Sequence, residues 1–93
     1  MSFRVNFTPT AEKDFRSLPK PIQTSALRQI KTLETNITPD GNRIKKLKGI
    51  KGTFYRLRIG DYRAVFEVEG KQVTILRVID RKDLDRIVSR LPK

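Results

Sequence analysis

The sequence predicts a small α+β fold in which an αα-hairpin packs on a sheet. Three observations lead to it. Residues 54–78 alternate apolar with polar side chains, which is typical of half-buried strands. Residues 9–36 repeat their apolar side chains at helical spacing, and residues 3–7 alternate again. The expected order is an N-terminal strand, an αα-hairpin, an antiparallel three-stranded meander and a C-terminal helix.

The first half of the chain supplies the strand and the hairpin of helices. The segment FRVNF, residues 3–7, alternates as a strand does, and Thr8 then fits a helix N-cap with Pro9 at the first helical position. Pro19 ends this helix, and the proline two residues later can open a second one over residues 21–36. The two helices carry these apolar stripes: Ala11, Phe15 and Leu18, then Ile22, Ala26, Ile30, Leu33 and Ile37.

A basic segment, RIKKLKGIKG, lies between the helices and the main strands. It holds five lysines or arginines and two glycines in residues 43–52, which predicts a mobile or edge-like stretch. A solvated basic loop is the simple interpretation. Its position just before an arginine-rich strand favours contact with phosphate, and the candidate RNA-binding lysines are Lys45, Lys46, Lys48 and Lys51, together with Lys82 further on.

The stretch FYRLRIGDYRAVFEV, residues 54–68, predicts a hairpin with arginines on one side. Gly60 at the first central position of a two-residue loop is typical of a type II′ turn. Pairing residues outward from this turn sets Arg58 opposite Arg63 and assigns the strand residues to two faces. The apolar face, expected against the helices, carries Tyr55, Leu57, Ile59, Tyr62, Ala64 and Phe66; the other carries Arg56, Arg58, Arg63 and Val65.

The pairing of Arg58 with Arg63 points to function rather than folding. Like charges directly opposite each other destabilise a sheet by about 0.2–1 kcal/mol. A solvated face is one explanation, although lysine and glutamate interspersed would provide solubility without repulsion. Three guanidinium groups on one face favour a phosphate site, because their planar forks donate bidentately and keep their charge.

The last third of the chain predicts a second hairpin and a helix. A turn at residues 70–71 pairs Val68 with Val73, Phe66 with Ile75, Ala64 with Arg77 and Arg63 with Val78. Arg77 then falls on the apolar face, so either a bulge changes the register or its stem reaches the sheet edge.

The helix is expected to begin after Asp80. Asp80 falls on the arginine side at the end of its strand, where it fits an N-cap. Arg81 follows within reach of the other three arginines, unless it is only a surface residue. The apolar stripe of the helix is Leu84, Ile87, Val88 and Leu91.

Composition narrows the classes of function. The 93 residues suit one domain, residues 1–93. Without cysteine the chain has no disulfide framework, thiolate nucleophile or thiolate metal site. The sequence also contains neither a signal sequence nor an apolar span of about 20 residues. A cytoplasmic protein is therefore expected. The 21 Lys and Arg against 10 Asp and Glu give a net charge of +11, which favours nucleic acid or an acidic protein as partner over a merely soluble basic protein.

The order of elements, with YRLRIGDYRAVFEV as its most specific part, strongly resembles the RelE/ParE toxin superfamily of toxin-antitoxin systems. The resemblance covers nearly the whole chain, and KKLKG and RKD match the family's basic loop and its ending more loosely. In the RelE branch it implies cleavage of mRNA in the ribosomal A site, with no metal or other cofactor, and masking of that surface by an antitoxin. The basic catalytic positions of that branch match Arg56, Arg58, Arg63 and Arg81.

Such cleavage needs a base, an acid and cations around the phosphorane. The chain has no histidine: Asp80 stands where the family often has one, Asp85 or its neighbours replace a frequent tyrosine, and Arg56 replaces a lysine of some members. The base can be Lys45, Lys46, Lys48, Asp80 or a ribosomal group. A gyrase-poisoning ParE-like toxin, or a catalytically weakened relative acting in antitoxin binding and repression, is the alternative function.

Overall fold

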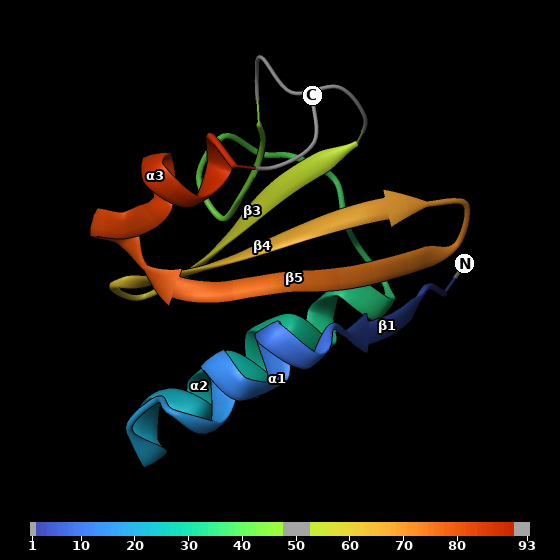
Figure 1. The fold of residues 1–93 in the computed structure, drawn as a ribbon. Coiled ribbons are helices and arrows are strands. Elements are labelled where there is room, and N and C mark those ends of the chain that lie inside the picture. The colour runs from blue at the N-terminus through green and yellow to red at the C-terminus, as the bar shows by residue number, and fades with distance from the viewer. Residues whose placement is uncertain (1, 48–52, 91–93) are drawn as a thin grey trace.

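The computed structural model describes residues 2–47 and 53–90, which form a five-stranded sheet with helices on both faces (Figure 1). The strand order is β1-β5-β4-β3-β2, antiparallel except for the parallel pair β1 and β5. This arrangement confirms the predicted α+β class. The elements are β1 (Arg4–Phe7), α1 (Pro9–Arg16), α2 (Lys20–Lys31), η1 (Thr32–Glu34), β2 (Ile44–Lys46), β3 (Phe54–Ile59), β4 (Tyr62–Glu69), β5 (Gln72–Asp80), η2 (Arg81–Asp83) and α3 (Leu84–Val88).

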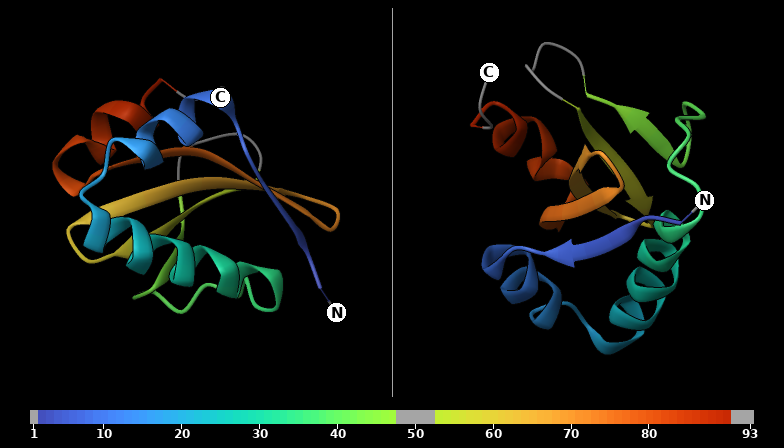
Figure 2. Two further views of the ribbon diagram at one scale, coloured as in Figure 1. Left: turned by 90° about the horizontal axis from the view of Figure 1, so that it is seen from below. Right: turned by 90° about the vertical axis from the view of Figure 1, so that its right-hand side faces the viewer.

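The αα-hairpin begins where the sequence places it. Thr8 Oγ1 accepts a hydrogen bond from the Ala11 backbone N–H at 3.0 Å and donates one to the Leu76 carbonyl at 3.1 Å, so this cap also ties α1 to β5. The second helix is shorter than expected, because the α-helical part ends at Lys31 and a 3₁₀ turn follows. In the right-hand view of Figure 2, α1 and α2 lie on one side of the sheet and α3 on the other.

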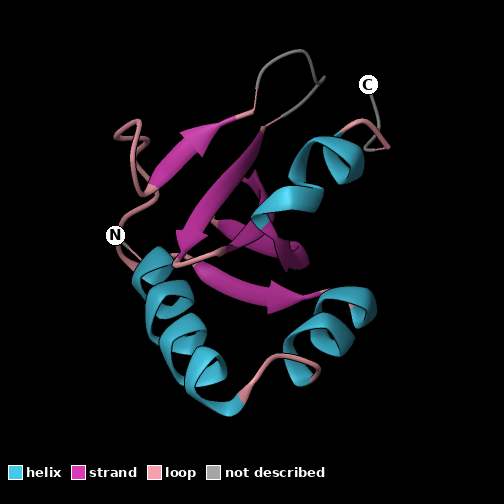
Figure 3. Cartoon of the chain, turned by 90° about the vertical axis from the view of Figure 1, so that its left-hand side faces the viewer, coloured by secondary structure: helices cyan, strands magenta, loops and turns pink. Residues whose placement is uncertain are grey.

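The larger core lies between the sheet and the α1–α2 hairpin. Phe66, Leu33, Ile44, Leu57 and Ile75 are its largest fully buried members. The smaller core lies under α3, where Val65 and Ile79 of the sheet pack with Ile87, and Leu47, Leu76 and Leu84 join them at the edge. Alternation along the strands thus supplies both cores, one on each face of the sheet. Figure 3 shows the helices that lie over these faces.

The sheet has a strand that the sequence analysis did not predict. Residues 44–46 of the basic segment form β2, which pairs Ile44 with Leu57 and Lys45 with Arg56 at the edge of the sheet. The antiparallel part of the sheet is therefore four strands rather than three. Ile44 is fully buried. Burial of this one isoleucine, which stands between basic neighbours in the chain, accounts for the formation of β2. The prediction of an edge-like segment is correct for these three residues, while the rest of it, residues 48–52, lies outside the described part.

The two hairpins differ in how well their registers were predicted. The β3–β4 register is confirmed from Tyr55 opposite Phe66 to Ile59 opposite Tyr62, with Gly60 at φ +57° in the turn. Positive φ at the first central residue, and not at Asp61, agrees with a type II′ turn.

The β4–β5 register is right only near its turn, since a bulge shifts the pairing between Val65 and Phe66. Ala64 therefore pairs with Val78 and Arg63 with Ile79, and the two predicted pairs there are wrong by one residue. The bulge, one of the two explanations offered for Arg77, is confirmed. It leaves Leu76 without a register partner, so that Ile75 and Val78, three residues apart, both reach the larger core.

None of the helices in the described part of the chain has the length and apolar character needed to span a bilayer.

Candidate functional site

Four arginines gather on the face of the sheet that carries α3. The β3–β4 register sets Arg58 opposite Arg63, and in the next pair on this face it sets Arg56 opposite Val65. The edge strand adds Lys45 opposite Arg56. Arg81 begins η2, directly after β5, and its backbone N–H donates to the Asp61 carbonyl of the β3–β4 turn at 2.9 Å. We call Arg56, Arg58, Arg63 and Arg81 the arginine cluster.

The pKa of Arg63 responds to the other three arginines of the cluster. Partial burial lowers the pKa of Arg63, and the positive charges of Arg56, Arg58 and Arg81 lower it further. Asp61 opposes this change but does not reverse it. A guanidinium keeps its positive charge in proteins, so this lowering does not neutralise Arg63. The cluster is thus a concentration of uncompensated positive charge at the surface.

Three arginines of the cluster are each held by a different contact. Arg63 Nη1 donates to the Gly60 and Tyr62 carbonyls, both at 2.8 Å, so the turn itself orients this side chain. Arg58 Nη1 donates to Asn42 Oδ1 at 3.1 Å. Arg81 lies 3.9 Å from a carboxylate oxygen of Asp61, a loose and largely exposed ion pair.

Arg56 is the arginine whose hydrogen bonding is incomplete. Its Nη1 is shielded from solvent and has no hydrogen-bond acceptor within the described residues. A buried donor without an acceptor costs free energy, and for a charged group the cost is larger. The adjacent cleft, about 270 Å³ in volume, lies between β2 and α3 and is lined by Lys45, Lys46, Leu47, Arg56, Leu84, Asp85 and Val88.

The predicted RNA-binding lysines are not equivalent in the structure. Lys45 shares the face of the arginine cluster, since it pairs with Arg56. Lys46 pairs with Tyr55 and so alternates to the other face, although it still contributes to the lining of the cleft. Lys82 is exposed in η2, whereas Lys48 and Lys51 lie outside the described residues.

The prediction that Asp80 lies on the arginine side is wrong. The bulge in β5 shifts the register by one residue, so Asp80 pairs with Tyr62. The ring of Tyr62 packs against the larger core, on the face that carries α1 and α2. Ile79 takes the place opposite Arg63 instead. The carboxylate of Asp80 accepts the Lys82 backbone N–H at 2.9 Å, which confirms its N-cap role, here at the 3₁₀ turn η2.

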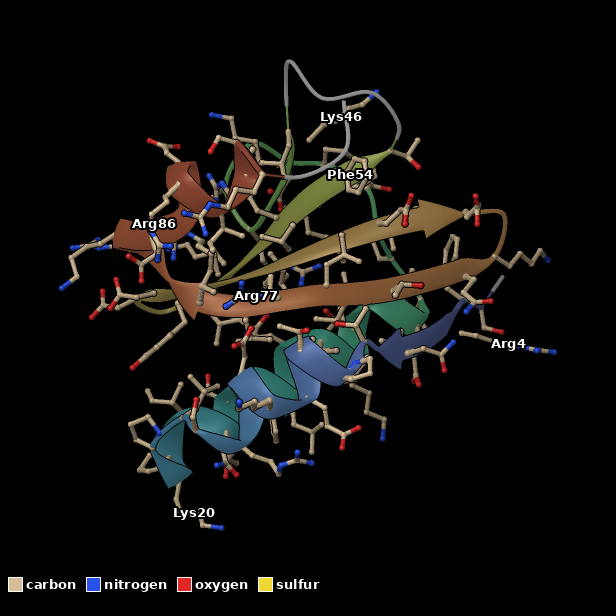
Figure 4. The ribbon with its side chains drawn as sticks, viewed as in Figure 1. Arg4, Lys20, Lys46, Phe54, Arg77 and Arg86 are labelled. Carbon is tan, nitrogen blue, oxygen red and sulfur yellow. The ribbon has the colours of Figure 1, made fainter. Side chains whose placement is uncertain are left out.

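Two polar contacts were not predicted from the sequence. One is the contact of Arg58 with Asn42, which sits in a loop 16 residues earlier in the chain. The dipeptide Asp40-Gly41 is typical of a turn, but nothing in it indicates which strand the loop would meet. The other is Asp14 of α1, which accepts from Arg77 Nε at 2.7 Å and Nη2 at 3.3 Å. Figure 4 shows Arg77 on β5 and Arg86 on α3.

Within the described ranges, no three acidic side chains come together in a way that could hold a metal ion. What the arrangement offers chemically is a set of fixed hydrogen-bond donors with positive charge. Such a set binds an oxyanion and stabilises charge that develops on it.

Comparisons with known proteins give the site a context. The chain matches the family described as ParE toxin of type II toxin-antitoxin system, parDE, over residues 5–89. It is 31% identical over 83 residues to toxin RelE3 of Methanocaldococcus jannaschii, with 87% of this chain and 93% of that protein covered.

Two solved complexes contain a chain similar to this one. The archaeal RelE–RelB complex from Pyrococcus horikoshii OT3 gives a TM-score of 0.74 at 32% identity, covering 87% of this chain and 97% of that one. The RelB–RelE antitoxin–toxin complex from Methanococcus jannaschii gives a TM-score of 0.70 at 29% identity, over 87% and 95% of the two chains.

Proposed function

Since this chain belongs to the RelE/ParE family of toxins of type II toxin-antitoxin systems, we propose that it is a metal-independent, ribosome-dependent mRNA endoribonuclease that inhibits translation. The observation that carries the proposal is the arginine cluster: four guanidinium groups on the face of the sheet that carries α3, with Arg58 and Arg63 directly opposite each other. The repulsion between these two guanidinium groups destabilises the fold, and a bound anion would relieve it.

The cluster suits the charge that develops during RNA cleavage. Attack of a 2′-hydroxyl on the phosphate gives a crowded phosphorane whose oxygens carry extra negative charge. Donors that are already in place stabilise this state without reorganising, and loss of one such donor typically costs about 10²–10³ in rate. In the proposed mechanism Arg63 and Arg81 stabilise the phosphorane, and Arg56 and Arg58 bind the flanking phosphate oxygens.

Proton transfer is the part with the fewest candidates. The chain has no histidine. The register of β5 places Asp80 on the face of the sheet that carries α1 and α2, away from the arginine cluster. Among the described residues, Lys45 is the candidate base nearest to the cluster, since it pairs with Arg56, and Lys46 lines the same cleft. The other candidates for the base are Lys48 and a ribosomal group. Acid–base catalysis contributes about 10²–10⁴ in rate, so an enzyme that relies on electrostatics and positioning is slow but still active.

The proposed partners follow from the same surface. Ribosome and mRNA supply the phosphates, and a cognate antitoxin, as in the solved RelE–RelB complexes, would neutralise a toxin of net charge +11 by bringing carboxylates to the cluster. The two proteins would form a hetero-oligomer in the cytoplasm, and this chain would act as one domain.

The test is cleavage of ribosome-bound mRNA by the purified toxin. The wild-type protein should cut the message, and Arg81→Ala should lower the rate by about 10²-fold or more if that guanidinium contacts the reacting phosphate. Arg28→Ala is the matched control, because it removes the same charge from an exposed position on α2, in the helical layer on the other face. Equal rates for Arg81→Ala and wild type would contradict the assignment.

Gyrase poisoning is the second candidate, favoured by the match to a family described by its ParE toxin and by the missing histidine. A supercoiling assay run beside the cleavage assay separates the two functions. A third outcome, absence of growth inhibition on induction although the four arginines are intact, would identify a weakened relative that acts only in antitoxin binding and repression.

A further inference from the structure

We propose that Asn42 is a positioning residue for Arg58, and that it is an asparagine because a neutral acceptor holds this guanidinium without cancelling its charge. The inference rests on the proposed role of the arginine cluster in binding RNA phosphates. It concerns a loop, residues 40–44, that lies outside the strands carrying the cluster.

The loop is built to present Asn42 to β3. The Asp40 carboxylate accepts three backbone N–H groups, from Asn42 at 2.8 Å, Arg43 at 2.7 Å and Ile44 at 3.1 Å. The Asp40 and Gly41 N–H groups in turn donate to the Ile44 carbonyl, at 2.9 and 3.2 Å. Gly41 adopts φ +78°, a conformation that other residues rarely take, so the turn depends on glycine here.

Three contacts anchor the loop to the rest of the molecule. Ile44 is fully buried in the larger core, Arg43 Nη1 donates to Thr32 Oγ1 at 2.8 Å, and the Arg58 backbone N–H donates to the Arg43 carbonyl at 2.8 Å. The last contact places the loop backbone against the residue whose side chain Asn42 holds. Asn42 therefore meets Arg58 from a supported position, although both side chains are exposed.

The chemistry of the two groups defines how Asn42 is oriented. A guanidinium has donors only, so it must meet the amide oxygen, and the amide nitrogen of Asn42 then remains as a further donor beside the cluster. An aspartate in this place would also accept from Arg58 but would neutralise it. The position thus combines a fixed guanidinium with an undiminished positive charge, as binding of a phosphate oxygen requires.

The test measures binding of a 2′-O-methyl single-stranded RNA oligonucleotide, which lacks the attacking hydroxyl, and cleavage of ribosome-bound mRNA in parallel. Asn42→Ala should weaken binding by about 3- to 10-fold, the size of one net hydrogen bond. Asn42→Asp should weaken it more, and the slope of log K against log salt should fall by about 0.7, as for one lost phosphate contact with a single strand. Asn36→Ala is the matched control, an exposed loop asparagine whose Oδ1 caps Thr38 instead.

A merely structural role predicts other results. If Asn42 only stabilised the loop, Asn42→Ala would unfold at a lower temperature but, well below that temperature, would bind RNA like the wild type, which would overturn the inference. Additive effects of Asn42→Ala and Arg58→Ala would also overturn it, since a residue that acts through Arg58 has no effect once Arg58 is absent. Unchanged thermal unfolding of both Asn42 variants is expected throughout.

The two proposals fail in different ways. RNA binding that depends on Asn42, together with no cleavage of ribosome-bound mRNA, would overturn the ribonuclease function and support the positioning role. Cleavage at wild-type rates by both Asn42 variants would support the ribonuclease and overturn the positioning role. Absence of RNA binding by the wild-type protein overturns the positioning role directly.

Discussion

Arginines occur in two regions of the same sheet, and their surroundings are opposite. Arg77 on β5 donates to the Asp14 carboxylate through two nitrogens, and the Val78 backbone N–H donates a third hydrogen bond to Asp14 at 3.0 Å. Arg56, Arg58 and Arg63 have no carboxylate within bonding distance among the described residues. The contrast teaches that this sheet compensates a cation where the cation supports packing and leaves cations uncompensated where a ligand can approach.

The surroundings also suggest which property each region supports. Asp14 and Arg77 are 18% and 32% exposed, so their bidentate pair is partly desolvated and joins α1 to the bulged part of β5. It therefore supports folding. The arginine cluster repels itself and lies on an open face, so removing one member should harm activity and spare stability.

The largest expected effect is on the catalytic rate of Arg63→Ala. Loss of a donor that stabilises the phosphorane should lower cleavage of ribosome-bound mRNA by about 10²–10³-fold. The free energy of unfolding, measured in urea, should change little, because the repulsion from Arg58 that the substitution removes offsets the two hydrogen bonds to the Gly60 and Tyr62 carbonyls that it also removes. Strong destabilisation would place Arg63 with Arg77 as a folding residue and break the contrast.

The next effect is on stability and concerns Asp14→Ala. It leaves Arg77 and the Val78 N–H without their acceptor, and we expect a loss of about 1–3 kcal/mol in the free energy of unfolding. RNA cleavage below the unfolding transition should be unaffected. Glu12→Ala is the control on the same helix, since its pair with Arg16 is exposed and should contribute about 0–1 kcal/mol. Equal losses for the two variants would show that the Asp14 pair is no special anchor.

A smaller effect is expected from salt on the wild-type protein. Between about 10 mM and 1 M salt the Debye length falls from about 30 Å to about 3 Å, so repulsion within the cluster is screened. The wild-type free energy of unfolding should rise, and the rise should be smaller in Arg63→Ala by a few tenths of a kcal/mol, as for one like-charge pair. Identical salt responses would mean that the cluster is already compensated.

The smallest effect concerns the loop that presents Asn42. Three backbone N–H groups, with that of Asn42 first, lower the pKa of Asp40 below its ordinary value of 3.8. A carboxyl whose pKa is lower in the folded state stabilises the fold above its unfolded pKa and loses this contribution as the pH falls through its folded pKa. Asp40→Asn should thus unfold at a lower temperature than wild type at neutral pH, and the difference should shrink below pH 3.8. A difference that persists in acid would assign the effect to loop geometry rather than to charge.

The sequence by itself determined the features in which local periodicity adjoins a clear turn or cap. Alternation about Gly60 predicted the β3–β4 register and both faces, so Arg56, Arg58 and Arg63 could be placed together without a structure. The cap of α1 followed from Thr8 and its neighbouring proline in the same way. In these cases neighbours in the chain are also neighbours in space, and the pattern contains the whole cause.

Tertiary structure decided the features in which distant segments compete for one place. The bulge in β5 keeps Ile75 and Val78 in one core, Arg77 at Asp14 and Ile79 in the other core, and it thereby turns Asp80 away from the arginines. Likewise, β2 exists because Ile44 is buried against β3, and Asn42 reaches Arg58 because its loop is anchored there. Such outcomes depend on packing between residues far apart in the chain, which periodicity within one segment does not record.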